Sequence, residues 1–489
     1  MWFKNFNSIS LIIIFSYLYS KELPQGLDSS EIEKTHLIPF MSRETLPPSG
    51  DIRNVAEYER MQGVLIRYPF GISTELIKEM SEDVKIYCLA SNNQIGSAES
   101  LLLDAGVFLE DIFFIVGSTD SYWTRDYGPW WVVNEERKMS IVDFTYNRPR
   151  PNDNDAPLKL STYFDSPYYA TSLIHAGGNY MTTGFSQSAS SDLVYLENDI
   201  SIAQVNQIME NYYGINQYDV IADPNNTYID HIDCWGKYLS TTKVLIRQVP
   251  QNHPQYEEVE SAALFFRNTN NSFGEEWKLF RVYTPDNQPY TNSLILNEKI
   301  FVPLVNSEWD DDAIVSYQNA MPGYEILGFT GSWESTDALH CRTKGIPDLK
   351  MLQIFHKPLT DSVDTNDLEI DSGYSVTINI DNLNNSNIVG SSVKLFWKKS
   401  TDSNWDETEF VKSNDSSTQA WGSIIPFQNL QSDVQYYIEA SDSTGKEERM
   451  PIAGYYSFTA LGLYSCDSWE KGDLNNNGDI DIFDILLLS

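Results

Sequence analysis

The sequence is short of positive charge, of cysteine and of long apolar runs. It holds 33 Lys and Arg against 69 Asp and Glu, which gives a formal net charge of -36 at pH 7. Because phosphate binding requires a basic surface, this balance argues against nucleic acid as a partner. Four cysteines in 489 residues cannot form a dense disulfide framework. They are Cys88, Cys234, Cys341 and Cys466.

The longest apolar run lies at the N-terminus, where Lys4 precedes the apolar residues 9–19. That run is too short to cross a bilayer comfortably but fits the core of a signal peptide. We therefore expect a signal peptide over residues 1–20, with cleavage near Ser20, and a secreted or cell-surface protein. An uncleaved N-terminal anchor is the alternative. No membrane span is expected once the signal is removed.

What the chain does contain is enough apolar and aromatic material, 41% and 13%, to build packed cores. Residues 21–50 are polar and irregular. From about Glu57 to about His356, strand patterns of period two alternate with helical patterns, which predicts an α/β region. The expected strands are 61–70, 84–90, 112–117, 242–250, 299–305 and 324–330, and the expected helices are 73–83, 95–106, 201–214 and 259–271.

Residues 362–460 are rich in Ser, Asp, Asn and Thr and carry short alternating strands. The expected strands are 374–380, 392–400, 434–442 and 454–460. Several short strands with polar turns predict an immunoglobulin-like β-sandwich.

The C-terminal residues 468–489 hold oxygen side chains at the spacing of a twelve-residue calcium loop. The predicted ligands are Asp473, Asn475, Asn477, Asp479 through its backbone carbonyl, and Asp484, with Asp481 at position nine and Gly478 at the sharp turn. The segment resembles one calcium repeat of a dockerin, either truncated or a single degenerate copy. The resemblance implies bound Ca²⁺ and a cohesin-like or cell-surface partner, whereas a plain acidic tail is the alternative.

Four separated segments carry chemistry: 123–131, 146–155, 228–237 and 335–345. His231 and Asp233 are two residues apart, and in a strand that spacing points both to one face. Together with Cys341 they supply an acid/base, a charge partner and a nucleophile. Asp126 and Asp233 can clamp a guanidinium, the planar cation with a matching fork of donors.

This set suits attack by the Cys341 thiolate on the central carbon of a guanidinium. His231 would protonate the departing nitrogen and then activate water, which leaves a ureido group and ammonia. The two carboxylates should hold the pKa of the Cys341 thiol above its ordinary value of about 8.5, because like charge disfavours a thiolate.

The motif order, WxRDxGP, then HxD, then a late cysteine, resembles the guanidine-modifying deiminases. The segment 175–180 resembles their glycine-rich strand, and Asn292 matches their active-site asparagine. The resemblance implies an α/β five-bladed propeller of ββαβ units, a pentein, over residues 50–356, with the site at its centre and no cofactor for catalysis.

Within that group the chain resembles the secreted bacterial peptidylarginine deiminases most, through its export signal, its sandwich and the segment "NRPRP". The resemblance implies that Arg148 and Arg150 hold the carboxylate of a C-terminal arginine. It implies that Trp123, Tyr228 and Asn292 line the substrate pocket, that Asp126 and Asp233 clamp the guanidinium, that His231 is the acid/base and that Cys341 is the nucleophile. Arginine-containing peptides or proteins would then be the substrates.

Other interpretations stay open at this point. An agmatine deiminase would use the same chemistry on a small guanidine. A cysteine peptidase is a second alternative, although two carboxylates beside the thiolate would oppose its oxyanion. A zinc site of His231, Asp233, Cys234 and Cys341 lacks paired-cysteine spacing. A non-enzymatic adhesin fits only the C-terminal third.

Overall fold

The computed structural model describes residues 23–360, 373–414, 420–428 and 431–460. The expected signal peptide, Cys466 and the expected calcium ligands Asp473, Asn475, Asn477, Asp479 and Asp484 lie outside these residues. In the described part of the chain, no helix combines the length and the apolar character that crossing a membrane requires.

The region up to Pro347 forms five small sheets, and each contains the same arrangement of strands. In each unit two strands pair antiparallel and the second then pairs parallel with a third, so a helix must carry the chain back between the parallel strands. The sheets are β1-β5-β6-β7 (Arg53–Asn54, Trp130–Val133, Met139–Tyr146, Tyr168–His175), β10-β9-β8 (Gln217–Ile221, Gln187–Ser191, Met181–Thr182), β11-β12-β13 (Gly236–Tyr238, Lys243–Gln248, Lys278–Tyr283), β14-β15-β16 (Leu294–Leu296, Lys299–Leu304, Glu325–Thr330) and β17-β2-β3-β4 (Lys344–Pro347, Met61–Arg67, Lys85–Ala90, Ile112–Val116).

The crossover helices bury one apolar face each against these sheets. Helix α8, for example, begins at a Ser201 capping box with Gln204, ends at Gly214 in the left-handed conformation and buries Val205 and Met209. The longer helices are α2 (Thr74–Ser81), α3 (Ile95–Asp104), α6 (Ala156–Phe164), α8 (Ile202–Tyr213), α9 (Tyr256–Asn268) and α10 (Asp310–Ala320). The expected helices and strands of this region correspond to these elements with shorter bounds, except that α9 begins and ends three residues before the expected helix 259–271.

The last strand of this region, β17, pairs antiparallel with β2, which lies near the start of the region. One sheet therefore joins the two ends of this α/β region, which the sequence predicts to be catalytic and which is called the catalytic region below, although the strands lie far apart in the sequence. This pairing fixes the position of the residues just before β17, among them Cys341.

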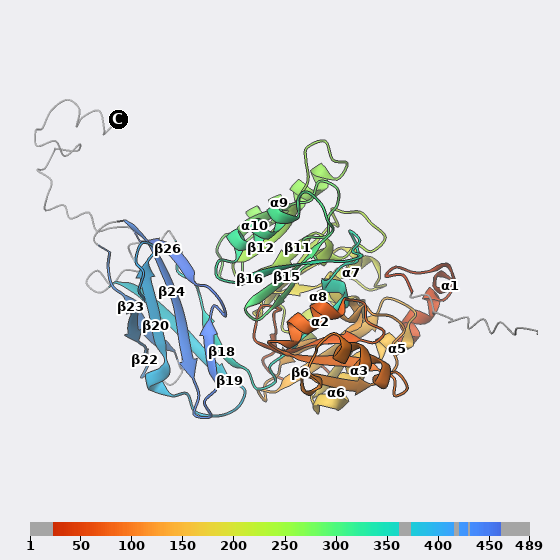
Figure 1. The fold of residues 1–489 in the computed structure, drawn as a ribbon, viewed down its shortest axis with the longest axis horizontal. Helices are drawn as coiled ribbons and strands as arrows, with labels where there is room; N and C mark the ends of the chain where they lie inside the picture. Colours follow the sequence, from red (N-terminus) through yellow and green to blue (C-terminus); the bar gives the residue numbers. More distant parts are fainter. Residues whose placement is uncertain (1–22, 361–372, 415–419, 429–430, 461–489) are drawn as a thin grey trace, which may run out of the picture.

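Two further sheets form a sandwich beside the catalytic region (Figure 1). Their strands share one core that includes Val376, Leu395 and Tyr436. The strands are β18 (Leu352–His356), β19 (Tyr374–Asn382), β23 (Trp421–Ile425) and β22 (Val411–Lys412) in one sheet, and β21 (Asp406–Glu409), β20 (Lys394–Lys399), β24 (Ser432–Ser441), β25 (Glu447–Met450) and β26 (Tyr456–Ala460) in the other.

The structure corrects the expected boundary of the catalytic region at residue 356. Strand β18 pairs antiparallel with β19 over its whole length, from Leu352↔Asn382 to His356↔Ile378, so it belongs to the sandwich. Its apolar pattern resembles that of a buried strand in either domain, and only the pairing partner distinguishes the two.

The expected lower boundary at residue 50 also omits part of the folded unit. Residues 23–49 lie along the catalytic region: Thr45 donates its backbone N–H to Ala170 O over 2.9 Å, and α1 (Ser29–Ile32) lies at the end away from the sandwich (Figure 1). Hydrogen bonds of this kind satisfy backbone groups of an irregular stretch, and no apolar period signals them.

Candidate active site

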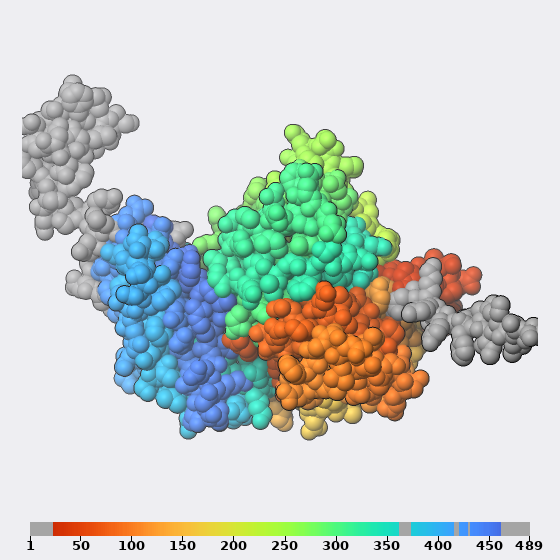
Figure 2. All heavy atoms as spheres, viewed as in Figure 1, coloured from red at the N-terminus to blue at the C-terminus, as the bar shows by residue number. Residues whose placement is uncertain are grey.

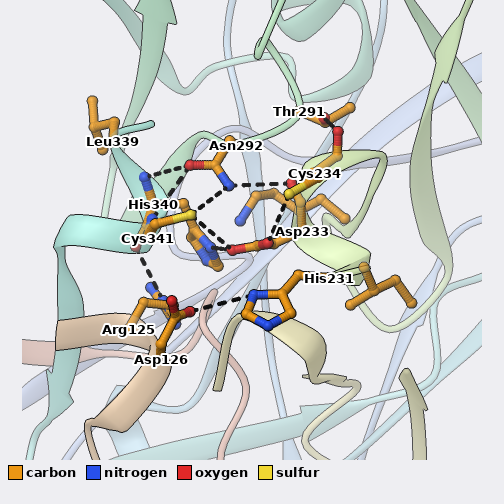
Figure 3. A network of polar contacts seen from close by, with 12 residues as sticks. Arg125, Asp126, His231, Asp233, Cys234, Thr291, Asn292, Leu339, His340 and Cys341 are labelled. Atoms are coloured by element: carbon orange, nitrogen blue, oxygen red, sulfur yellow. Dashed lines mark hydrogen bonds and ion pairs between the residues drawn. The ribbon is translucent and has the colours of Figure 1, made fainter. Parts of the chain in front are cut away.

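The predicted catalytic side chains meet at short turns between the sheets (Figure 3). Asp126 lies on α4 (Thr124–Tyr127), Asp233 in the 3-10 turn η4 (Ile232–Cys234), and Cys341 in the 3-10 turn η5 (His340–Arg342). His231 directly precedes η4 in extended conformation. The expectation that His231 and Asp233 share a strand face is therefore wrong, and a tight turn brings them to the same space instead.

Asn292, just before β14, holds the turn that carries the thiol. Its Oδ1 accepts the backbone N–H of His340 over 3.0 Å and that of Cys341 over 3.3 Å. Its Nδ2 donates to Cys341 Sγ over 3.3 Å. One amide thus fixes both the backbone and the sulfur atom of Cys341.

The turn is also clamped from its other end by Arg342. Its guanidinium bonds to both carboxylate oxygens of Asp337, over 2.9 and 2.7 Å, and lies 4.9 Å from the centre of the Tyr122 ring. A planar cation held by a bidentate carboxylate and an aromatic face has little freedom. The backbone at Cys341 is therefore fixed on both sides.

A buried ionic network supports Asp233 from behind. His340 Nδ1 lies 2.6 Å from Asp233 Oδ2, and His340 Nε2 lies 2.6 Å from Glu57 Oε2. Glu57 also pairs with Arg125 and Lys237, each over 2.8 Å. Burial alone would raise the pKa of Asp233, but the hydrogen bond from His340 holds it below its ordinary value. Asp233 is thus kept ionised 3.8 Å from Cys341 Sγ.

Asp126 is the opposite case. Burial, and then the charge of Asp233, raise the pKa of Asp126 to about 8. Its Oδ1 lies 3.5 Å from His231 Nδ1, and neither atom has a hydrogen-bond partner among the described residues. Burial lowers the pKa of His231 to about 3, so the imidazole is neutral. An acid with one unpaired oxygen, Oδ1, and a neutral base therefore face one space.

Gly178, in the 3-10 turn η3 (Gly177–Asn179), keeps that space open. A Cβ there would lie 2.5 Å from Asp126 Oδ1, 2.8 Å from His231 Nδ1 and 3.1 Å from Asp233 Oδ2. These distances show that the three side chains surround a single point, which a larger residue would fill.

The thiol of Cys341 is fully buried. Burial, then the charges of Asp233 and Asp126, raise its pKa well above the ordinary value. The direction agrees with the expectation from the two carboxylates, although burial is the larger cause. A cation placed between the carboxylates would reverse the electrostatic part of this shift.

Arg148 and Arg150 lie where β6 has ended and α5 (Pro151–Asn154) begins, 5% and 1% exposed. The guanidinium of Arg150 stacks on Trp123, 5.2 Å from the ring centre. Both arginines contact the backbone of residues 24–26. Tyr228 is 67% exposed, and its hydroxyl lies 3.5 Å from Thr336 Oγ1. It therefore lies at the outer edge, or rim, of the site.

Sequence reasoning missed Glu57, His340, Gln25 and Glu31. Gln25 donates to Asp126 Oδ2 over 3.3 Å, and Glu31 pairs with Arg150 over 2.7 Å. A signal existed for His340, which is next to Cys341 in a segment already singled out. None existed for Glu57 or Gln25, which lie in unpatterned stretches.

The zinc alternative finds no support in the residues that the structure describes, because no group of three or more His, Cys, Asp or Glu side chains there has the geometry to hold a metal ion. Cys88, Cys234 and Cys341 are buried free thiols.

Repeated sheets around a buried thiol, two carboxylates and an imidazole define a hydrolase of guanidino groups. The family model described as Porphyromonas-type peptidyl-arginine deiminase matches residues 66–347, more than half of the chain. The chain belongs to this family.

Similar proteins carry agmatine deiminase in their names. A Yersinia pestis protein is 26% identical over 275 residues, which is 47% of this chain and 75% of that protein. Agmatine deiminase of Medicago truncatula is 23% identical over 335 residues, 56% of this chain and 87% of the relative. The structure of Enterococcus faecalis agmatine deiminase aligns with a TM-score of 0.55 and 18% identity, covering 62% of this chain and 99% of that chain. At 18% identity the structural similarity shows the fold alone.

Proposed function

We propose that this chain hydrolyses the guanidino group of peptidyl-arginine to give peptidyl-citrulline and ammonia, with a preference for arginine at a C-terminus. The observation that carries the proposal is the space in front of Gly178, where Asp126, Asp233 and His231 converge beside Cys341. Closure of the five sheets into a five-bladed propeller around this space is part of the proposal.

In the first step the guanidinium lies between Asp126 and Asp233, and its charge favours transfer of the Cys341 thiol proton to the neutral imidazole of His231, which leaves a thiolate. The sulfur atom forms a bond to the central carbon. The bond from that carbon to a terminal nitrogen breaks, and this nitrogen leaves as ammonia with a proton delivered by His231. The product of this step is a thiouronium on Cys341.

In the second step water attacks the same carbon and gives its proton to His231. The carbon–sulfur bond breaks, the thiolate is released, and a ureido group remains. The chemistry is balanced by one water consumed and one ammonia released. Asn292 positions the sulfur through both steps.

The preference for peptides is supported by Arg148 and Arg150. They are buried, and both donate to main-chain carbonyl oxygens of a peptide segment. A terminal carboxylate in that place would accept charge-assisted bonds, worth roughly 1.5–3 kcal/mol each. Agmatine has no carboxylate and would leave both arginines unused.

Agmatine is nevertheless the second candidate, since the relatives named above carry that activity in their names. A cysteine peptidase is disfavoured because Asp233 lies 3.8 Å from the thiol, where it would repel an oxyanion.

The deciding experiment measures ureido formation from a peptide ending in arginine, its amidated twin, a peptide with internal arginine, agmatine and free arginine. We expect the free C-terminal peptide to exceed the amidated one by at least ~10-fold in kcat/KM. The double change Arg148→Ala and Arg150→Ala should remove that ratio, while Arg137→Ala, on an exposed loop, should keep it. Equal rates for the two peptides, or a much higher rate with agmatine, would refute the peptide assignment.

Export and calcium binding by the tail belong to the same proposal. They rest on the apolar run 9–19 and on the oxygen spacing from Asp473 to Asp484. We propose a secreted or cell-surface enzyme whose tail binds a cohesin-like or cell-surface partner.

A further inference from the structure

The chain's own N-terminal segment occupies the place proposed for substrate. The backbone carbonyls of Pro24 and Gly26 accept bonds from Arg150 Nη2 over 2.6 and 2.9 Å. The carbonyl of Gln25 accepts a bond from Arg148 Nε over 3.0 Å. Three successive main-chain carbonyls are therefore bound by the arginine pair.

The side chain of Gln25 enters the guanidinium site itself. It is 3% exposed, and its Nε2 donates to Asp126 Oδ2 over 3.3 Å. A primary amide presents an N–H to a carboxylate as a guanidinium does, but it has no guanidino carbon and no charge. The amide is also neutral, so Asp126 can remain protonated beside it, in keeping with a pKa raised to about 8.

A short helix latches the segment in place. Asp28 and Glu31 form a capping box at the start of α1, which orients the Glu31 carboxylate. Glu31 then forms two bonds with Arg150, over 2.7 and 3.0 Å, and is 5% exposed. At the other side Tyr228 covers Gly26, where a Cβ would lie 2.5 Å from the ring. Tyr228 thus closes the rim over the segment.

The segment is tethered, and apart from the buried Ile38 its tether lies at the surface. Arg43 donates to Asn154 O over 3.2 Å, and Thr45 and Ala170 exchange two bonds, which anchors the chain after residue 41. Between latch and anchor, Ile32 is 59% and Phe40 84% exposed. Figure 2 shows this N-terminal part of the chain on the outside of the catalytic region, at the end away from the sandwich.

We infer that residues 24–31 are an intramolecular pseudosubstrate, with Gln25 in the place of the substrate arginine, which keeps the enzyme latent until the segment leaves. The inference rests on the proposed function, because it takes Asp126 as a ligand of the substrate guanidinium.

The test uses the full chain with the recognition sequence of a specific protease inserted between the exposed residues Glu33 and Lys34. Uncut protein is compared with cut protein from which the N-terminal peptide has been removed. One readout is deimination of arginine peptides and agmatine. The other is alkylation of Cys341 by chloroacetamidine, a small cationic probe that needs the guanidinium site but no turnover.

Cutting should raise both kcat/KM and the rate of Cys341 alkylation by at least ~10-fold, because only the open fraction of the uncut enzyme can bind. A synthetic peptide of residues 23–33 should restore the low rates by competition. Equal alkylation rates before and after cutting would overturn the pseudosubstrate. Faster alkylation without turnover of any guanidine would leave the pseudosubstrate standing and refute the deiminase function instead.

A second comparison needs no protease. Glu31→Gln removes the charge opposite Arg150 but keeps a residue that can complete a capping box. It should raise the alkylation rate of the uncut chain several-fold, on the scale of one charge-assisted bond. The exposed neighbour Glu33→Gln should leave it unchanged. Equal behaviour of the two variants would overturn the latch.

Discussion

Asn292 Nδ2 donates to Cys341 Sγ over 3.3 Å, while Asn292 Oδ1 accepts the backbone N–H of the same cysteine over 3.3 Å. The nucleophile is thus held through its side chain and its backbone by one amide. Both residues are buried, so neither contact is screened by water.

Asn292→Ala should lower kcat by at least ~10²-fold and the free energy of unfolding by about 1–3 kcal/mol, because the buried backbone N–H of Cys341 loses its acceptor and that of His340 keeps only the main-chain carbonyl of residue 292. Asn292→Asp keeps the acceptor but places an oxygen against the sulfur, so it should lose turnover with a smaller loss of stability. Single-turnover kinetics and urea unfolding measure the two effects. Wild-type turnover in Asn292→Ala would contradict the positioning role.

Cys341→Ser should abolish ammonia release and leave the fold intact, because a hydroxyl is a far weaker nucleophile and nearly the same size. Cys88→Ser, in β3, is the matched control for a buried thiol and should retain turnover. The assay is ammonia release, with circular dichroism to monitor folding. Full activity of Cys341→Ser would exclude a covalent mechanism.

Asp126→Asn and Asp233→Asn should each lower kcat/KM by at least ~10²-fold, on the order of 3 kcal/mol, the cost of losing a buried charged hydrogen bond. Their stabilities should differ. Asp233 bonds to His340 over 2.6 Å, so the Asp233→Asn variant should unfold more easily than the wild type. The Asp126→Asn variant should not. Thermal unfolding of both variants separates the roles, and equal destabilisation would contradict this assignment.

Stability should fall with rising pH through the titration of Asp126. Its folded pKa is raised to about 8 from an ordinary value of 3.8, so between these values the folded state keeps a proton that the unfolded state loses. The contribution is complete below the unfolded pKa and lost as pH rises to about 8. It amounts to a slope of up to about 1.4 kcal/mol per pH unit.

Asp126→Asn should remove that slope. Asp143 and Asp153, whose pKa values burial raises to about 7, keep their own contribution in both proteins, so only the difference between the two is diagnostic. Urea unfolding from pH 5 to pH 9 provides the measurement. Identical pH profiles for wild type and variant would show that Asp126 is ionised in the folded enzyme.

Chelation of calcium should change the order or partner binding of the tail and leave deimination unaltered. The predicted ligands, Asp473 to Asp484, follow the sandwich in the sequence, whereas the groups that face Cys341 all come from the catalytic region. Deimination rates with excess EGTA, beside isothermal titration of calcium, test this. Strict calcium dependence of turnover would point to a second site.

Hydrophobic periodicity predicted the α/β region and the second β region, because burial imposes a period on strands and helices. Motif order predicted the side chains that meet at the site, which are Asp126, His231, Asp233, Asn292 and Cys341. They failed where side chains act without a period. Glu57 lies between strands and pairs with Arg125, Lys237 and His340, none of which is near it in sequence. Gln25 lies in a polar stretch that only its contact with Asp126 makes meaningful. Such contacts are determined by the tertiary fold rather than by the conformational preferences of neighbouring residues.

The pairing of β17 with β2 determines how late in synthesis the catalytic site can be completed. Cys341 directly precedes β17, whose partner leaves the ribosome near the beginning of the catalytic region. At roughly 5–20 residues per second, synthesis of the intervening chain takes on the order of tens of seconds. Throughout that time β2 lacks this neighbour and the carboxylates face no thiol. The nucleophile is therefore the last catalytic group to leave the ribosome, and a nascent chain carries no deiminase activity before Cys341 has emerged.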